Sequence, residues 1–431
     1  MDRINQKLGT DYALFNYYGA EDAGRVIIAM GSVCDATEEV VDYLNAQGEK
    51  VGLVKVRLYR PFRADRLLSA IPSTVKSVAV LDRTKEPGSQ GEPLYQDVVT
   101  ALANGGRREI TVIGGRYGLG SKDTAPNSIF AVYRELAAEQ PKRIFTIGID
   151  DDVSGLSLPL EKAPTTTPEG TVSAKFWGLG GDGTVGANKN SIKIIGDNTD
   201  MYAQAYFDYD SKKSGGVTMS HLRFGKKPIK STYLIHQANF VACHNPAYIR
   251  KFNMSQELVD GGTFLLNCSW NAEELETHIP PQVKKFIYDH KINFYTIDGV
   301  KIGIETGMGP TRINTILQSA FFKLAAIISE EDAIRLMKEA AELMDVQVDI
   351  PVPDLMAMWG AGYSIPSKEG NEAIAMMMKL EGIVLDTCYT GKAFAGLIRR
   401  AREGFYKSDD NVLFIHTGGA GGLFAQDWEN A

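Results

Sequence analysis

Short apolar runs alternate with stretches of helical spacing along the first 150 residues. A short apolar run bounded by turn residues is typical of a buried strand, whereas apolar positions repeated every three or four residues indicate an amphipathic helix. Such a helix is predicted at 35–47, closed by Gly48. The predicted strands are 25–30, 51–59, 78–81, 110–113 and 144–148. Strands separated by helices predict a parallel sheet covered on both faces.

The pattern restarts after residues 157–170, a stretch rich in proline and threonine that we interpret as a linker. Further strands are predicted at 171–177, 240–243, 263–266 and 294–297, and helices from about Thr184, at 314–326 and at 330–343. A third unit has predicted strands at 383–385 and 412–416 and a helix at 392–402. We therefore predict an α/β fold with two consecutive doubly wound, mainly parallel-sheet domains and a small α/β C-terminal tail. The predicted boundaries are 1–156, 157–342 and 343–431.

Composition narrows the class of protein. The chain has 431 residues, 44% of them hydrophobic, and a net charge of −7. An acidic chain does not match the basic face that nucleic-acid binding requires. Its apolar runs are shorter than the roughly 20 residues that span a bilayer, and the N-terminus has no apolar signal region. We expect a cytoplasmic protein that binds neither nucleic acid nor membrane.

The cysteines argue against a local metal site. Cys34, Cys243, Cys268 and Cys388 lie far apart, without a CxxC pair. Neither a zinc ribbon nor a ferredoxin-type iron–sulfur cluster can be built by that spacing. We therefore expect no metal ligands, and cysteines scattered in this way suit a reducing compartment.

A glycine-rich run lies between the predicted strand 171–177 and the helix predicted from Thr184. Glycines let the backbone turn tightly and approach a ligand, and a helix N-terminus offers N–H groups and a positive dipole end to an anion. Two interpretations are open: a phosphate or pyrophosphate cradle, and a tight strand–helix junction that binds nothing. The candidate residues are Gly178, Gly180, Gly181, Gly183, Gly186 and Lys189.

Other features favour structural roles. Arg116 lies in a glycine-rich turn and is able to hold a carboxylate or phosphate, but a structural turn at a domain edge is the simpler interpretation. His244 follows a predicted strand and is either an acid–base group or a satisfied structural histidine. His416 lies beside the last glycine-rich turn. The chain has no nucleophile elbow, P-loop or paired-carboxylate motif, so its catalytic residues stay unknown.

Seven longer motifs carry a more specific signal. Segments 31–34, 54–62, 81–88 and 115–123 resemble the second domain of pyruvate:ferredoxin (flavodoxin) oxidoreductases, and segments 176–189, 221–227 and 242–246 resemble the third. The resemblance runs from residue 1 to about residue 342. Members of this family oxidatively decarboxylate pyruvate with thiamine diphosphate, pass electrons through iron–sulfur clusters to ferredoxin or flavodoxin, and form acetyl-CoA.

The resemblance implies a supporting role for this chain. The family's thiamine and cluster domains have no counterpart here, so we expect a fragment that binds none of these cofactors and is inactive alone. The third domain of the family handles coenzyme A, which makes the glycine run a candidate coenzyme A loop or active-site lid. The expected partners are a second copy or the missing domains, with ferredoxin or flavodoxin reached only through the intact enzyme. The alternative is a non-catalytic coenzyme A or subunit-binding module.

The tail resembles a different family. Segments 359–366, 385–392 and 414–419 are similar to the C-terminal end of D-cysteine desulfhydrases and aminocyclopropanecarboxylate deaminases, which are pyridoxal-phosphate enzymes of fold type II. That resemblance places Tyr363, Tyr389, Thr390 and Thr417 near the cofactor ring, whereas Lys392 is not the Schiff-base lysine. The tail is thus interpreted as a remnant of such an enzyme. A natural fusion and a joining error in the gene both explain the change of resemblance near 341–345.

Overall fold

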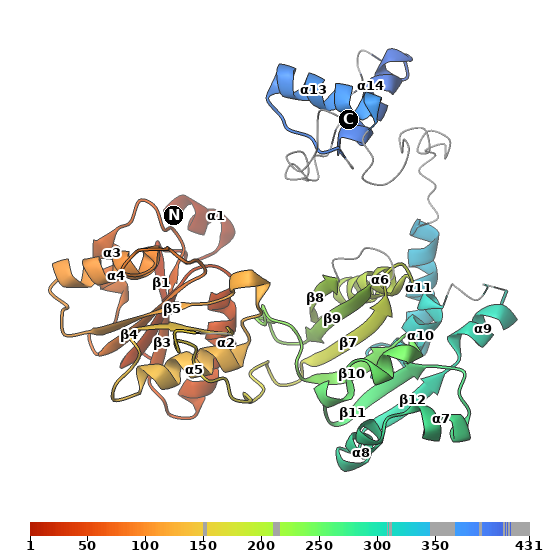
Figure 1. The fold of residues 1–431 in the computed structure, drawn as a ribbon, viewed down its shortest axis with the longest axis horizontal. Coiled ribbons are helices and arrows are strands. Elements are labelled where there is room, and N and C mark those ends of the chain that lie inside the picture. Colours follow the sequence, from red (N-terminus) through yellow and green to blue (C-terminus); the bar gives the residue numbers. More distant parts are fainter. Residues whose placement is uncertain are drawn as a thin grey trace. The chain divides into compact units, whose positions relative to one another are not determined.

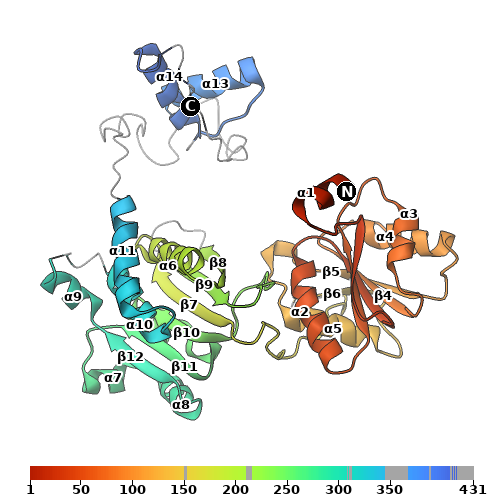
Figure 2. The ribbon, with the colours of Figure 1, turned by 180° about the vertical axis from the view of Figure 1, so that it is seen from behind.

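The computed structural model describes residues 1–149, 153–209, 216–307, 309, 313–344, 367–387, 390–407, 410, 412 and 414. It divides into two compact units, Met1–Lys338 and Glu339–Ala431. The first unit contains two six-stranded sheets, each flanked by helices, as Figures 1 and 2 show. The two mainly parallel sheets predicted from the apolar pattern are confirmed.

The first sheet has the strand order β1-β3-β2-β4-β5-β6. β1 runs antiparallel to β3, and the other neighbouring strands of this sheet are parallel. The strands are β1 (Phe15–Gly19), β2 (Arg25–Ala29), β3 (Val51–Val56), β4 (Ser77–Asp82), β5 (Thr111–Arg116) and β6 (Ile144–Thr146). All five predicted strands of this region are present. The half-buried edge strand β1 has no continuous apolar run, which is why the sequence pattern does not predict it.

Helices cover both faces of this sheet because alternate residues of a strand point to opposite sides. α2 (Val33–Ala46) and α5 (Pro126–Leu136) pack with Ile27 and Leu53 on one face. α3 (Ala64–Ala70) and α4 (Pro93–Asn104) pack with Ile28 and Val54 on the other. α1 (Asp2–Leu8) precedes β1, and a 3-10 turn, η1 (Leu119–Ser121), precedes α5. This is the doubly wound arrangement that the sequence predicts.

The second sheet has the order β12-β11-β10-β7-β9-β8. β7, β10, β11 and β12 are parallel, whereas β9 runs antiparallel to both of its neighbours. The strands are β7 (Val172–Leu179), β8 (Tyr202–Tyr209), β9 (Val217–Gly225), β10 (Ala238–Cys243), β11 (Leu258–Asn267) and β12 (Asn293–Ile297). The pair β8–β9 is not predicted from the sequence; β8 in particular contains no fully buried residue.

One face of the second sheet carries an aromatic core in which Phe321 contacts Phe176 and Phe240. The helices on this face are α6 (Thr184–Asn198), α10 (Asn314–Ala325) and α11 (Glu330–Met344). The opposite face carries η2 (Pro246–Arg250), η3 (Ser255–Glu257), α7 (Ala272–His278) and α8 (Pro281–Asp289). α9 (Gly299–Glu305) follows β12. The helices predicted near Thr184, at 314–326 and at 330–343 are thus confirmed.

The second unit contains two helices in its described part, α13 (Lys368–Glu381) and α14 (Thr390–Arg402). The helix predicted at 392–402 is therefore confirmed. The strand predicted at 383–385 is wrong, because these residues form no regular element and Leu385 is buried against Ile374. A strand needs a neighbour to accept its backbone hydrogen bonds, and the described tail offers none. The strand predicted at 412–416 lies mostly outside the described residues.

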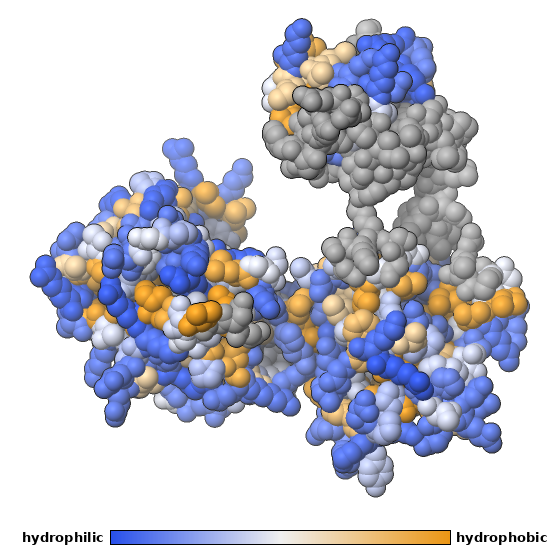
Figure 3. All heavy atoms as spheres, in the orientation of Figure 1, coloured by the Kyte–Doolittle hydropathy of each residue, from blue (hydrophilic) through white to orange (hydrophobic). Residues whose placement is uncertain are grey.

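The distribution of hydrophilic and apolar side chains on the surface agrees with that of the buried apolar clusters. On the face drawn in Figure 3, hydrophilic side chains predominate and apolar side chains gather in small groups. Four buried apolar clusters lie on the two faces of the two sheets. Among the described helices, none combines the length and apolar character required to cross a membrane.

Residues 226–237, which connect β9 to β10, form a docking loop on the first domain. Glu39 of α2, only 4% exposed, accepts hydrogen bonds from Ser231 (2.6 Å) and Tyr233 (2.7 Å) of this loop. It also accepts one from Thr166 of the linker, at 3.2 Å. Because three hydroxyl groups donate to one buried carboxylate, its charge is solvated by the protein instead of by water.

Further contacts fix the docking loop on both sides. Glu38, beside Glu39, forms ion pairs with Lys55 and, at 2.5 Å, with Lys230 of the loop. Burial alone would raise the pKa of Glu38, but the two lysines outweigh it and hold the pKa below its usual value. Arg223, 4% exposed, donates to the carbonyl groups of Ser231, Tyr233 and Leu234 at 2.8–3.2 Å. Arg223 of the second domain thus sets the shape of the docking loop, and the glutamates of the first domain anchor it.

Replacing Glu39 by alanine should loosen this docking. Three hydroxyl groups lose a charged acceptor, and we expect the midpoint of thermal unfolding to fall with a loss of roughly 2–4 kcal/mol in stability. Trypsin should cleave after Lys162, in the linker, faster than in the parent chain. Glu49→Ala is the control, because its ion pair with Arg25 is exposed and worth less than about 1 kcal/mol. An unchanged cleavage rate in Glu39→Ala would contradict the proposed anchor.

Candidate functional site

The glycine run lies where the connections of the second sheet change direction. β7 and β10 are parallel neighbours. After β7 the chain passes through α6 to β8 on one side of the sheet, whereas after β10 it continues to β11 on the other side. Open α/β sheets bind ligands at such a switch point, beyond the carboxyl ends of the strands. The fold therefore places the predicted glycine run at a position suited to a ligand.

Three of the five glycines in this run are required by the geometry of the turn. Gly181 and Gly183 have φ angles of +96° and +85°, which favour glycine. A Cβ atom on Gly178 would lie 2.6 Å from Oγ1 of Thr184, and one on Gly183 would lie 2.9 Å from Nδ2 of Asn314. A Cβ atom on Gly186 would meet open space. Gly180 donates its amide to the carbonyl of residue 216 at 2.7 Å. A tight strand–helix junction explains three of the five glycines without a ligand, and Gly186 is left without such a reason.

Asp182 occupies the N-terminus of α6 and changes the electrostatics of the turn. Its carboxylate accepts the amides of Leu179 and Thr184, each at 2.8 Å. The negative charge that the helix dipole favours is therefore supplied by the chain itself. A phosphate would have to use the next amides, of Val185 and Gly186, which have no partner within an α-helix. The sequence pattern missed Asp182, although an acidic residue directly before a helix is a usual capping signal.

His244 ties the glycine turn to the sheet. It is 7% exposed, and its Nδ1 lies 2.7 Å from Oγ1 of Thr184. Asn267 donates to the carbonyl of His244 at 2.9 Å and accepts the amide of Gly299 at 3.0 Å. Burial lowers the pKa of His244 to about 4, so the ring is neutral at pH 7. The structure therefore favours the structural interpretation of this histidine.

The other predicted site residues that the structure describes make contacts of their own. Lys189 is exposed, and its ammonium lies 5.5 Å from the centre of the Phe207 ring on β8. Arg116 forms an ion pair with Glu92 at 2.6 Å, as expected of a structural turn. Thr390 is buried and donates to Asp386 at 2.5 Å. The other tail residues and the last histidine lie outside the described residues: Tyr363, Tyr389, Thr417 and His416.

A cavity of about 530 Å³ lies at the carboxyl ends of β10, β11 and β12. It is lined by Cys268, Asp298, Lys301 and Ile304, among others. Burial raises the pKa of the Cys268 thiol, so this cysteine is not an activated thiolate. The sequence pattern does not predict this cavity, because its lining comes from three separate segments of the chain that only the fold brings together.

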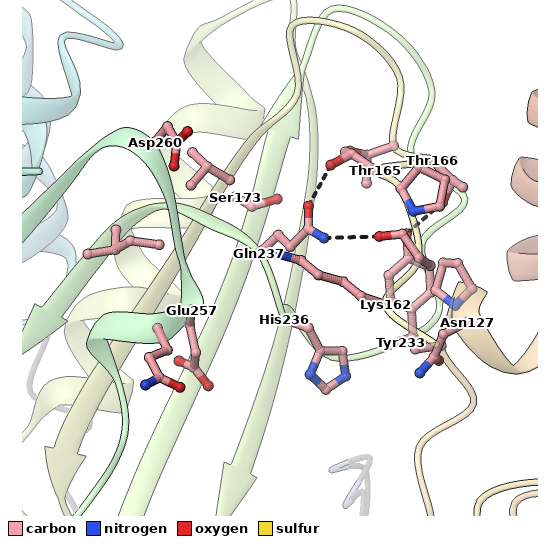
Figure 4. Close-up of a pocket in the computed structure, with 18 of the residues that line it drawn as sticks. Asn127, Lys162, Thr165, Thr166, Ser173, Tyr233, His236, Gln237, Glu257 and Asp260 are labelled. Carbon is pink, nitrogen blue, oxygen red and sulfur yellow. Dashed lines mark hydrogen bonds between the residues drawn. The ribbon is translucent and has the colours of Figure 1, made fainter. Parts of the chain in front are cut away.

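A second cavity, of about 470 Å³, lies at the opposite ends of the strands, between the linker and the start of β11. Figure 4 shows Gln237 reaching across to the linker, where it accepts from Thr165 at 2.6 Å and donates to the carbonyl of Ala163 at 3.3 Å. The charged groups at this cavity are largely paired already: Glu257 with Lys175 at 2.5 Å, His236 with Asp123 at 2.9 Å, and His290 with Asp260 at 2.6 Å. The glycine run does not line this cavity.

In the part of the chain that the structure describes, no three His, Cys, Asp or Glu side chains are arranged to hold a metal ion.

Comparison with known families identifies most of the first unit. The model "Pyruvate:ferredoxin oxidoreductase core domain II" matches residues 23–129, and "Pyruvate ferredoxin/flavodoxin oxidoreductase" matches residues 173–346. These two segments belong to the pyruvate:ferredoxin/flavodoxin oxidoreductase family. The first runs from β2 to the start of α5, and the second from β7 to the end of α11. The resemblance of the first two domains to this family is thus confirmed.

Individual oxidoreductases match across both domains. The pyruvate:ferredoxin oxidoreductase of Moorella thermoacetica is 57% identical over 340 residues, which cover 79% of this chain and 29% of the relative. The pyruvate-flavodoxin oxidoreductase of Enterobacter agglomerans is 55% identical over 343 residues, with the same two coverages. The mitochondrial pyruvate dehydrogenase (NADP+) of Euglena gracilis is 46% identical over 342 residues, covering 79% and 19%. The chain therefore spans less than a third of the length of these relatives.

The tail stands apart from these matches. Neither family model extends beyond residue 346. The resemblance of residues 343–431 to pyridoxal-phosphate enzymes stays a prediction. In the described part of the tail, the hydroxyl of Thr390 is engaged by Asp386, so it is not free to face a cofactor ring in this conformation.

Burial of His244 predicts a specific loss of stability in acid. The unfolded chain takes up a proton near pH 6.5, whereas the folded chain does so only near pH 4. Stability should therefore be complete above pH 6.5 and fall by roughly 2 kcal/mol as the pH drops towards 4.5. Urea unfolding between pH 7.5 and 4.5 measures this slope, and His244→Asn should be less stable at pH 7.5 but show a flatter pH profile. Equal slopes in both proteins would show that His244 is not buried in its neutral form.

Proposed function

We propose that residues 1 to about 342 form two supporting domains of an enzyme that oxidatively decarboxylates pyruvate to acetyl-CoA and passes the electrons to ferredoxin or flavodoxin. The observation that carries this proposal is the identity of 57% and 55% to two such oxidoreductases over 340 residues or more. That stretch includes both sheets and the docking loop that joins them. At this identity we expect the relatives to share the fold and the contact between the two domains.

The electron acceptor is set outside these two domains. Relatives at 46–57% identity over the same stretch are named for ferredoxin, flavodoxin and NADP+. The names differ, although each of the three relatives matches both domains of this chain at 46% identity or more. We therefore propose that this chain contributes to the enzyme's body and to substrate handling, and reaches its acceptor through the domains that carry thiamine diphosphate and iron–sulfur clusters. Its expected location is the cytoplasm.

Within this function, the glycine run is proposed to contact coenzyme A. The switch-point position and the open space at Gly186 support it. The carboxylate of Asp182 opposes it, because it already occupies the helix N-terminus. The alternative function, a coenzyme A or subunit-binding module without chemistry, rests on the same turn. The pyridoxal-type tail is proposed to be a remnant that holds no cofactor.

The two functions are separated by complementation. The chain is mixed with separately produced thiamine-binding and iron–sulfur domains of a relative, and reduction of a viologen dye is followed with pyruvate and coenzyme A. A supporting part of the oxidoreductase should restore pyruvate-dependent reduction, whereas the remaining domains alone should give little. Glu39→Ala should restore less than the parent chain, because the two domains no longer dock. No restoration, with coenzyme A still bound, would favour the binding module.

Two substitutions at the turn test coenzyme A contact directly. Asp182→Asn removes the competing charge, so coenzyme A affinity should rise by about threefold to tenfold. Gly186→Ala places a methyl group over the open amides and should weaken binding, while improved helix propensity stabilises the fold by about 0.5–1 kcal/mol. Lys193→Ala, on the exposed side of α6, is the matched control. Calorimetric titration measures the affinities, and three unchanged values would remove the glycine run from the coenzyme A site.

A further inference from the structure

The cavity between the linker and the start of β11 contains a polar side chain that the rest of the chain leaves unsatisfied. Ser173 of β7 lines this cavity and is only 6% exposed. Its amide is bonded to the side chain of Asn239 at 2.9 Å, but its hydroxyl forms no hydrogen bond within the described residues. An almost fully buried hydroxyl without a partner is unfavourable, and a ligand that accepts its proton would remove that cost.

Two cations at the same cavity have no carboxylate partner. Lys162 and Arg223 both line it, and neither forms an ion pair with another residue that the structure describes. Figure 4 shows the side chain of Lys162 reaching from the linker towards the sheet. Arg223 is directly opposite Ser173 in the register of β7 and β9, so the two side chains lie side by side on one face of the sheet. A positive charge therefore lies on either side of the unsatisfied hydroxyl.

The N-terminus of α5 forms another wall. Residues 125–127 line the cavity, and no side chain caps this helix. A helix N-terminus offers amide groups and a partial positive charge, which both favour an anion. Asp123, which precedes the helix, is already engaged by His236 at 2.9 Å and by the amide of Leu234 at 3.2 Å. The dipole of α5 thus adds to the positive potential of the cavity.

The carboxylates that line the cavity have cations of their own. Glu257 is paired with Lys175 at 2.5 Å, and the second oxygen of this carboxylate is buried. Asp260 is paired with His290 at 2.6 Å. Because these charges are compensated locally, the lysine and arginine without partners determine the sign of the charge that a ligand would meet.

We propose that this cavity binds a small organic anion, whose carboxylate or phosphate group accepts the hydroxyl of Ser173 and pairs with the ammonium of Lys162. The volume of about 470 Å³ leaves room for more than the charged group, and Leu258, Val259 and Phe286 provide an apolar wall for the rest of the molecule. Apolar walls with a few well-placed polar groups are typical of sites for small molecules.

Binding at this place would fasten the linker to the second sheet. Lys162 belongs to the linker and Ser173 to β7, and Gln237 already bonds the same linker at Thr165 and Ala163. An anion that bridges the two elements adds a contact across the same gap, so its concentration would control how firmly the linker is held. The site lies at the opposite ends of the strands from the glycine turn, and the proposal does not rest on the proposed oxidoreductase function.

Calorimetric titration of the full chain at constant ionic strength tests the site, with glycerol 3-phosphate and succinate as the probes. At least one of them should bind saturably, and the tighter of the two identifies the charged group that the cavity prefers. Lys162→Gln should weaken that binding by about tenfold, and Ser173→Ala by about threefold or more, because each loses a hydrogen bond to a charged group. Lys193→Gln, an equal change of charge on the exposed side of α6, is the matched control and should bind as the parent chain does.

Thermal unfolding without ligand separates binding from folding. Ser173→Ala removes a hydroxyl that has no partner, and Lys162 is exposed, so both variants should keep the midpoint of the parent chain. Saturating ligand should raise the midpoint of the parent chain and slow its cleavage by trypsin after Lys162. The proposal would be overturned by the absence of binding for both probes, by equal affinities in the parent chain and the two variants, or by a midpoint that falls in Ser173→Ala together with the affinity.

Discussion

Three hydroxyl groups converge on the buried carboxylate of Glu39, and the arrangement of the two domains depends on this contact. A buried carboxylate is tolerated only when donors replace the water it has lost. Those donors come from the docking loop and the linker. The carboxylate of Glu39 therefore cannot stay buried in this way unless the second domain is in place. Arg223 holds the loop in the shape that presents them. Burial of one charge on the first domain thereby specifies where the second attaches.

The glycine turn combines a position suited to a ligand with a geometry that contacts within the chain already explain. Its position at the switch point is what a ligand site in an α/β sheet requires. Its glycines and His244, however, are explained by packing and by hydrogen bonds within the chain. Asp182 places a negative charge where a phosphate would otherwise bind. Any coenzyme A contact therefore has to use the amides beyond Asp182, which limits it to the exposed side of the first turn of α6.

The division of labour among the relatives fits this picture. Oxidoreductases named for different electron acceptors share this stretch at about half identity or more. The described residues hold no cluster of metal-ligating side chains, and at the cavity beside the linker Glu257, His236 and His290 each have a side-chain partner. This distribution is consistent with the supporting role proposed for the two domains.

The sequence by itself determined the parallel strands of both sheets, the position of the glycine run and the family resemblance of the first two domains. These follow from local periodicity and from contiguous motifs. Only the tertiary structure placed Asp182 on the helix dipole, Lys189 beside Phe207, and Ser231 on Glu39, 192 residues away in the chain. It also removed the strand predicted at 383–385, because no partner strand accompanies it in the described tail. Contacts between distant residues depend on how whole elements pack, and local sequence patterns carry no record of that.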